Sequence, residues 1–214
     1  MGLNLRVKDL VEATGGFLLK GEANKEVQSI NTDSRKIRPG DFFVALKGEK
    51  FDGHDFIKEA IKKGAEGVIL SKNLEIQDDV IIIKVNDTLK ALQDIASYYR
   101  KKLNAKVIGI TGSSGKTTTK TLIGQLLSLK GKVCMSKENF NNEIGVPLSI
   151  LDANRYTQFL ILEMAMRNKG EIRLLSKISE PDIGVITNIG WAHIGRLGSK
   201  EAIMEAKSEI FDHI

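Results

Sequence analysis

The sequence predicts an α/β protein of two domains, in which the second domain is built on a parallel sheet covered by helices on both faces. Three observations favour this fold. Short apolar runs alternate with amphipathic helical patterns through the second half of the 214 residues, as they do in three-layer parallel sheets. One longer helical pattern lies between the two halves. The composition, 42% hydrophobic and 28% charged, is that of a folded globular chain.

The first domain is expected to span residues 1–85 and to be a small α/β unit. A short helix over residues 5–13 is stopped by Gly15 and Gly16. A second helix over residues 55–63 has an apolar face and Gly64 as its cap. Apolar runs bounded by turn residues predict strands at 17–19, 27–30, 42–46, 67–70 and 80–85.

A connecting helix is expected within residues 86–105, where Asp87 is suited to cap its N-terminus. The second domain then spans residues 106–214. Its strands are predicted at 107–110, 132–135, 158–163 and 183–187, and its helices at 116–129, 170–177 and 199–211.

Composition excludes several classes of protein. The single cysteine, Cys134, cannot form an intrachain disulfide, which favours a reducing cytoplasm. The apolar runs are too short to cross a bilayer, and the N-terminus does not have the pattern of a signal peptide. The net charge of +5 is spread along the chain, so we expect no nucleic-acid partner but some attraction for anionic substrates. A cytoplasmic monomer without membrane insertion is expected.

A phosphate-binding loop is the strongest local motif. It reads Thr-Gly-Ser-Ser-Gly-Lys-Thr-Thr and stands between an apolar strand and an amphipathic helix. The glycines allow backbone N–H groups to converge on an anion, and the helix N-terminus adds partial positive charge. Lys116 can reach the β- and γ-phosphates, while the Thr117 hydroxyl can ligate Mg²⁺. We therefore predict ATP binding at Thr111, Gly112, Ser113, Ser114, Gly115, Lys116, Thr117 and Thr118.

One position departs from the common pattern, because Ile110 stands where that pattern has glycine. The alternative is a chance Gly-Lys-Thr in an ordinary turn. A strand before the loop and a helix after it argue against chance.

Two further polar residues follow predicted strands. Glu163 ends an apolar strand, and because the C-terminal ends of parallel strands face the nucleotide, its carboxylate is expected to point at the metal. His193, together with Asn188, follows another strand on the same rim. The alternatives are an ordinary loop acid for Glu163 and a structural or merely exposed imidazole for His193.

Lys207 interrupts the apolar face that Ile203, Ile210 and Phe211 form on the last helix. One interpretation is that the stem packs while the ammonium reaches water. The other is a partly desolvated amine with a lowered pKa, which CO₂ can convert to a carbamate that ligates metal. The residues alone leave both interpretations open.

Taken together, these motifs resemble the Mur ligases of peptidoglycan synthesis. Residues 31–48 and 51–56 are similar to the uridine-nucleotide-binding domain of that family, and residues 110–120 are similar to its ATP loop. Residues 139–147 and 187–193 resemble the branch that adds D-alanyl-D-alanine, whereas the branch that adds the third amino acid is the alternative.

The resemblance implies a role for each matching residue. Lys116 would contact the phosphates, Thr117 and Glu163 would hold Mg²⁺, and Asn142 would lie near phosphates and substrate. His193 would serve a second Mg²⁺, and Lys207 corresponds to the lysine that is carbamylated in several members. The catalytic set is therefore Lys116, Glu163, His193 and Lys207, and Ser34 with Arg35 would help to hold the uridine diphosphate.

The reaction implied uses ATP and Mg²⁺ to phosphorylate the terminal carboxylate of a UDP-N-acetylmuramoyl-tripeptide. The amine of D-alanyl-D-alanine then attacks the acyl phosphate. The family has three domains and this chain ends at Ile214, within the second, so weak or no turnover is expected from it alone. The rival interpretations are a simple NTPase and a non-catalytic fragment that binds a UDP-sugar and ATP.

Overall fold

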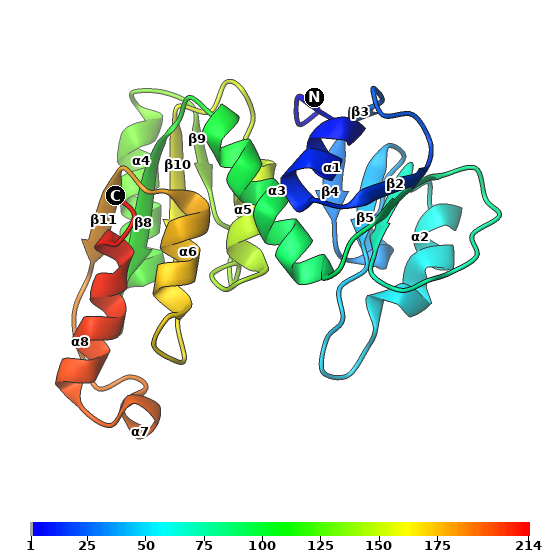
Figure 1. The fold of residues 1–214 in the computed structure, drawn as a ribbon. Helices are drawn as coiled ribbons and strands as arrows, with labels where there is room; N and C mark the ends of the chain where they lie inside the picture. Colours follow the sequence, from blue (N-terminus) through cyan, green and yellow to red (C-terminus); the bar gives the residue numbers. More distant parts are fainter. Residues whose placement is uncertain (1) are drawn as a thin grey trace. The chain divides into compact units, whose positions relative to one another are not determined.

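The computed structural model describes residues 2–214 and divides into two compact units, with the division between Tyr98 and Tyr99. Both units are α/β, as the sequence predicts (Figure 1). The helix α3 (Thr88–Lys102) contains the division. Asp87 accepts a hydrogen bond from the Lys90 backbone N–H at 2.9 Å, so the expected N-cap is confirmed.

The first unit is built on a five-stranded sheet in the order β2-β7-β6-β5-β4. Four of its strands are parallel, and β2 is antiparallel to β7. Every residue of β5 and β6 is buried, as expected of central strands covered on both faces. The strands are β2 (Phe17–Lys20), β4 (Ser29–Asn31), β5 (Asp41–Val44), β6 (Gly67–Leu70) and β7 (Ile81–Lys84).

The helices of the first unit lie close to their predicted positions. They are α1 (Val7–Thr14) and α2 (Ile57–Lys62), the latter preceded by the 3-10 turn η2 (Gly53–Phe56). Gly64 has a φ of +96° after α2, so its predicted role as a cap is confirmed. The predicted strand 27–30 differs, because it is two strands that belong to different sheets. Its first part, β3 (Glu26–Val27), pairs with β1 (Leu5–Arg6) instead of joining β4.

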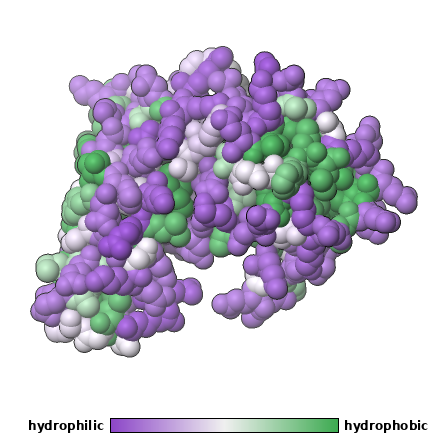
Figure 2. Space-filling model, viewed as in Figure 1, coloured by the Kyte–Doolittle hydropathy of each residue, from purple (hydrophilic) through white to green (hydrophobic). Residues whose placement is uncertain are grey.

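Apolar side chains remain exposed on β2, which is an edge strand of this sheet. Phe17 and Leu19 point away from the core, and Figure 2 shows the hydrophobic surface around this strand.

The second unit contains a four-stranded parallel sheet in the order β11-β8-β10-β9. Its strands are β8 (Lys106–Thr111), β9 (Val133–Met135), β10 (Phe159–Glu163) and β11 (Ile183–Ile186). Glu163 pairs with Ile110, and Ile186 pairs with Thr111. This register brings the C-terminal ends of three strands to one edge of the sheet, next to the predicted phosphate loop.

Helices cover both faces of this sheet, as predicted. Ile108 and Ile110 of β8 pack with Ile123 of α4 (Lys116–Ser128). On the opposite face, a Cβ at Gly109 would lie 3.2 Å from Ile210 of the turn η3 (Glu209–Phe211), which continues α8 (Lys200–Ser208). The alternation along β8 therefore separates two layers of helices.

Two helices of this unit were not expected from the sequence, namely α5 (Gly145–Asp152) and α7 (Ile194–Leu197). In α5 the first turn is stabilised by Asn142, whose Oδ1 accepts a hydrogen bond from the Gly145 N–H at 2.9 Å. Pro147 is accommodated because the first turn requires no donor there. The predicted helix 170–177 is confirmed as α6 (Glu171–Ser179).

Candidate functional site

The phosphate loop connects β8 to α4, as the sequence predicts. Gly112 and Gly115 have φ values of +148° and +77°, which favour glycine. A Cβ at Gly112 would lie 1.9 Å from Thr187 Oγ1, so a side chain there would displace the neighbouring segment.

The loop ends in a cradle of free backbone donors. Within residues 2–214, no hydrogen bond uses the N–H groups of residues 115–118, which open α4. Lys116 Nζ donates to the Gly112 carbonyl at 2.9 Å and so lies across the loop. Free amides, a helix N-terminus and a lysine together form an anion site. The N–H groups of Ser113 and Ser114, by contrast, donate to Asn188 Oδ1 at 3.1 and 3.0 Å.

Glu163 lies beside this cradle, at the end of β10. The residue is 6% exposed, and its carboxylate accepts hydrogen bonds from Thr117 Oγ1 at 2.8 Å and Asn141 Nδ2 at 3.0 Å. Burial tends to raise the pKa of Glu163, but these two hydrogen bonds and two nearby lysines outweigh burial and lower it. The carboxylate is therefore held ionised next to the Thr117 hydroxyl.

These oxygen ligands fit Mg²⁺. Magnesium in nucleotide sites is commonly held by one or two protein oxygens, with phosphates and waters completing its coordination. The part of the chain that the structure describes contains no cluster of three or more His, Cys, Asp or Glu side chains placed to hold a metal. A metal ion here would therefore depend on Glu163, Thr117 and the nucleotide.

Sequence reasoning did not identify two residues that contact Glu163, namely Asn141 and Lys120. Lys120 is buried, lies 3.7 Å from Glu163 Oε2 and donates to the Ser136 carbonyl at 2.8 Å. The available signal was spacing, because Lys120 follows Thr117 by three residues and so shares its face of α4.

Asn142 and His193 line one polar cavity of about 520 Å³, together with Arg167 and Arg196. Burial lowers the pKa of His193, and the charges of Lys207 and Lys116 lower it further. The positive charges of both lysines therefore disfavour a proton on the His193 imidazole. The imidazole favours the neutral form, which is the form that ligates metals.

Lys207 is only 2% exposed, so its side chain is almost wholly buried and does not extend into solvent. Burial lowers its pKa from 10.5 to about 8, and the charge of Lys116 contributes to this shift. Ile203 and Ile210 are fully buried, as expected. The prediction that Phe211 shares this buried face is wrong, since η3 follows α8 and leaves Phe211 50% exposed.

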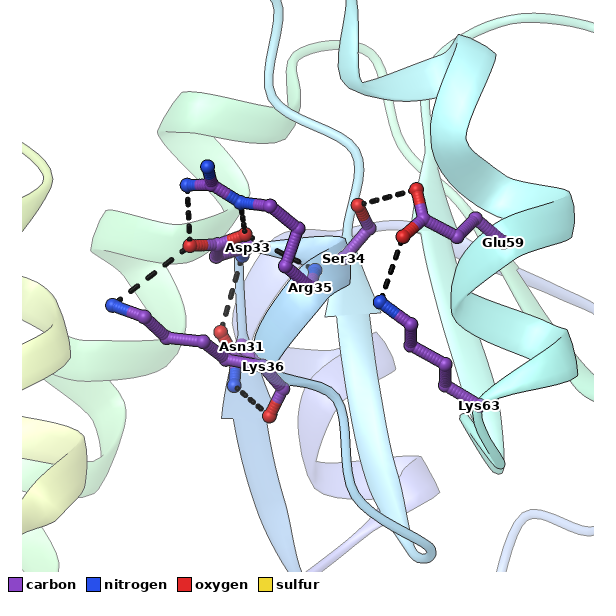
Figure 3. Close-up of polar contacts among 7 residues, drawn as sticks. All are labelled: Asn31, Asp33, Ser34, Arg35, Lys36, Glu59 and Lys63. Atoms are coloured by element: carbon purple, nitrogen blue, oxygen red, sulfur yellow. Dashed lines mark hydrogen bonds and ion pairs between the residues drawn. The ribbon is translucent and has the colours of Figure 1, made fainter.

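Ser34 and Arg35 lie in the first unit, beside a separate cavity of about 720 Å³. Figure 3 shows that both are held by carboxylates. Arg35 forms a two-pronged contact with Asp33, from Nε at 2.8 Å and from Nη2 at 2.9 Å, whereas the Ser34 hydroxyl donates to Glu59 at 3.1 Å. The hydrogen bond from Arg35 lowers the pKa of Asp33 to about 2. The Arg35 side chain stays largely exposed, so its remaining donors are accessible to a ligand.

The inner wall of this cavity is apolar. Phe43 and Leu46 line it, and Phe51 and Phe56 meet edge to face at its rim with ring centroids 6.4 Å apart. Aromatic and aliphatic walls beside a few polar groups are typical of sites that bind small molecules.

Solved structures of ligases resemble this chain. MurF from Acinetobacter baumannii has a TM-score of 0.89 and 39% identity, over 98% of this chain and 46% of that one. MurF ligase from Thermotoga maritima in complex with ADP has a TM-score of 0.79 and 41% identity, over 87% of this chain and 43% of that one.

A curated relative from Synechocystis sp., UDP-N-acetylmuramoyl-tripeptide–D-alanyl-D-alanine ligase, is 48% identical over 188 residues. The match covers 87% of this chain and 41% of the relative. The chain therefore spans less than half the length of the relatives it matches.

Family models match both halves of the chain. The model described as "Mur ligase family, catalytic domain" matches residues 26–100, and the model described as "Mur ligase middle domain" matches residues 110–214. Among residues 2–214, no helix combines the length and the apolar character needed to cross a bilayer. Because the two matched segments together cover most of the sequence, the chain belongs to the Mur ligase family.

Proposed function

We propose that this chain provides the nucleotide site and the UDP-substrate site of an ATP-dependent ligase that adds D-alanyl-D-alanine to UDP-N-acetylmuramoyl-tripeptide. The observation that carries this proposal is the cradle of free amides at residues 115–118, with Lys116 across it and the ionised Glu163 beside Thr117. Identities of 39 to 48% to ligases of this branch support the choice of substrate over that of the branch adding the third amino acid.

The chemistry follows from the charges. A carboxylate is a poor electrophile, and its phosphorylation by ATP supplies a good leaving group for attack by the dipeptide amine. Lys116 and the backbone amides of the α4 N-terminus stabilise the negative charge of the ATP phosphates while the γ-phosphoryl group is transferred. Thr117 and Glu163 would hold Mg²⁺, which when bound would supply further positive charge to the site. The polar cavity lined by Asn142 and His193 would receive the reacting end of the tripeptide.

The first unit would hold the UDP part of the substrate. Its apolar wall suits the base, and the exposed face of Arg35 suits a phosphate. We accordingly assign residues 1–85 to substrate binding, residues 86–105 to the linker and residues 106–214 to ATP binding. Calorimetric titration with the UDP-muramoyl tripeptide and, separately, with Mg-ADP tests the proposal. That the chain acts as a monomer in the cytoplasm remains a prediction.

A binding-only role is the second candidate, because the observations at both sites concern the binding of phosphates and of a UDP moiety. The two candidates differ in one measurement. Phosphate release from Mg-ATP that requires both the tripeptide and D-alanyl-D-alanine would establish turnover and exclude an NTPase that acts alone.

The lowered pKa of Lys207 predicts that the free energy of unfolding depends on pH. Between pH 8 and 10.5 the unfolded chain keeps the Lys207 proton while the folded chain loses it, because the folded pKa is about 8. The free energy of unfolding of the wild type therefore rises with pH across this window. In CO₂-free buffer, Lys207→Met is expected to be more stable than wild type at pH 7, with an advantage that shrinks towards pH 10 in urea titrations.

Carbamylation of the Lys207 amine can be tested by labelling with ¹³C-bicarbonate. We expect ¹³C-bicarbonate to give a carbamate carbon resonance in the wild type that is missing in Lys207→Met. The exposed Lys130→Met serves as the matched control. A stability difference that does not change with pH, together with no carbamate signal, would remove Lys207 from the proposed metal ligands.

A further inference from the structure

The segment that follows β11 lies along the outer turn of the phosphate loop. The paired strands end at Ile186 and Thr111, but contact continues beyond them. The Thr187 N–H donates to the Thr111 carbonyl at 3.0 Å, and Thr187 Oγ1 donates to the Ser114 carbonyl at 2.6 Å. The loop is therefore built against this segment as well as between its own strand and helix.

Asn188 makes the central contacts of this segment. Its Oδ1 accepts hydrogen bonds from the backbone N–H groups of both Ser113 and Ser114, at 3.1 and 3.0 Å. Its Nδ2 donates to Ser114 Oγ at 2.7 Å, and its backbone carbonyl accepts from the Ser113 N–H at 3.1 Å. One asparagine side chain thus satisfies two amides that the motif alone would assign to phosphate.

The two groups of loop amides consequently have different partners. Those of Ser113 and Ser114 are bonded to Asn188, whereas within the described residues those of 115–118 have no partner. An anion at a helix N-terminus can accept hydrogen bonds only from backbone N–H groups that are unpaired.

We propose that Asn188 is a positioning residue that holds the Ser113–Ser114 turn so that the amides of residues 115–118 converge on the nucleotide phosphates. This inference rests on the proposed nucleotide site in the second unit. Asn188 itself does not contact the nucleotide. The opposite arrangement is a plug, in which Asn188 occupies amides that the phosphates later take over.

The surrounding contacts favour Asn188 as a fixed positioning residue, or anchor, over Asn188 as a plug that the phosphates displace. Gly190 N–H donates to Ser113 Oγ at 2.9 Å, so the turn is bonded on both sides of Asn188. A Cβ at Gly190 would lie 3.2 Å from Ser113 Cβ, which shows how closely the two backbones pack. Withdrawal of Asn188 would disturb all these contacts together.

Calorimetric titration of the 214-residue chain with Mg-ADP tests the anchor. Asn188→Ala is expected to bind Mg-ADP about tenfold more weakly, since two amide hydrogen bonds that shape the cradle are lost. Asn104→Ala, which alters an exposed asparagine before β8, is the matched control and should bind as the wild type does. Equal or tighter binding by Asn188→Ala would overturn the proposal, and tighter binding would indicate a plug.

Amide hydrogen exchange of the wild type provides a readout that does not depend on how the variant folds. Without ligand, the Ser113 and Ser114 amides should exchange slowly and those of residues 115–118 rapidly. Mg-ADP should slow the second group and leave the Asn188 side-chain amide protected. Release of that amide on binding would contradict the anchor. If the wild type binds no Mg-ADP, the proposed nucleotide site is wrong. If the wild type binds Mg-ADP and Asn188→Ala binds it equally well, only the positioning role of Asn188 is wrong.

Discussion

Lys116→Ala is expected to weaken Mg-ATP and Mg-ADP binding on the order of a hundredfold, because it removes a charged donor that the loop holds across its own opening. The ammonium bonds only the Gly112 carbonyl within the described residues, so the fold depends little on it. Calorimetric titration at constant ionic strength measures the loss.

Lys130→Ala is the matched control for this variant, since it removes an exposed lysine just beyond the C-terminal end of α4. Both variants should melt near the wild-type temperature. Unchanged nucleotide affinity in Lys116→Ala would show that the loop does not hold phosphate.

Glu163→Gln is expected to abolish the gain in nucleotide affinity that Mg²⁺ provides. Glutamine keeps the shape and an acceptor for Thr117, but it loses the charge that attracts the metal. Titrations with ADP in the presence of Mg²⁺ and of EDTA should then give similar affinities, whereas the wild type should bind more tightly with Mg²⁺. The exposed Glu138→Gln should retain the wild-type dependence on magnesium.

The same substitution has a stability cost that must be separated from the metal effect. Lys120 lies buried 3.7 Å from Glu163, and the loss of its counter-charge is expected to cost about 3 kcal/mol of unfolding free energy. Lys120→Met combined with Glu163→Gln removes the isolated charge and should recover stability without recovering the magnesium effect. A double variant that regains the Mg²⁺ dependence would exclude Glu163 as a metal ligand.

The fold could largely be predicted because its strands are short apolar runs with turn residues between them. The elements that could not be predicted depend on distant parts of the chain. In α5, Gly145 and Pro147 are poor helix formers, and its residues are helical because Asn142 caps the first turn and most side chains are buried. The four residues of α7 are too few for a periodic pattern to reveal.

The candidate site likewise has parts that the sequence predicts and parts that depend on distant residues. The phosphate loop is a local motif, so strand, glycines, lysine and helix all lie within one stretch of sequence. The contacts of Asn141 and Lys120 with Glu163, and of Asn188 with Ser113, join residues 22, 43 and 75 positions apart, which only the folded sheet brings together. Spacing places Lys207 on the apolar face of the last helix, but the extent of its burial follows from how α8 packs.

Calorimetric titration of the 214-residue chain with UDP-N-acetylmuramoyl-tripeptide tests the proposed function most directly. We predict saturable binding at one site, competition by UDP, and roughly tenfold weaker binding in Arg35→Ala, whose exposed guanidinium is assigned to the diphosphate. Lys116→Ala should leave this titration unchanged, which separates the two ligand sites. A chain that binds Mg-ADP but shows no saturable binding of the tripeptide, and no competition by UDP, would contradict the assignment of the first unit to the substrate of a D-alanyl-D-alanine-adding ligase.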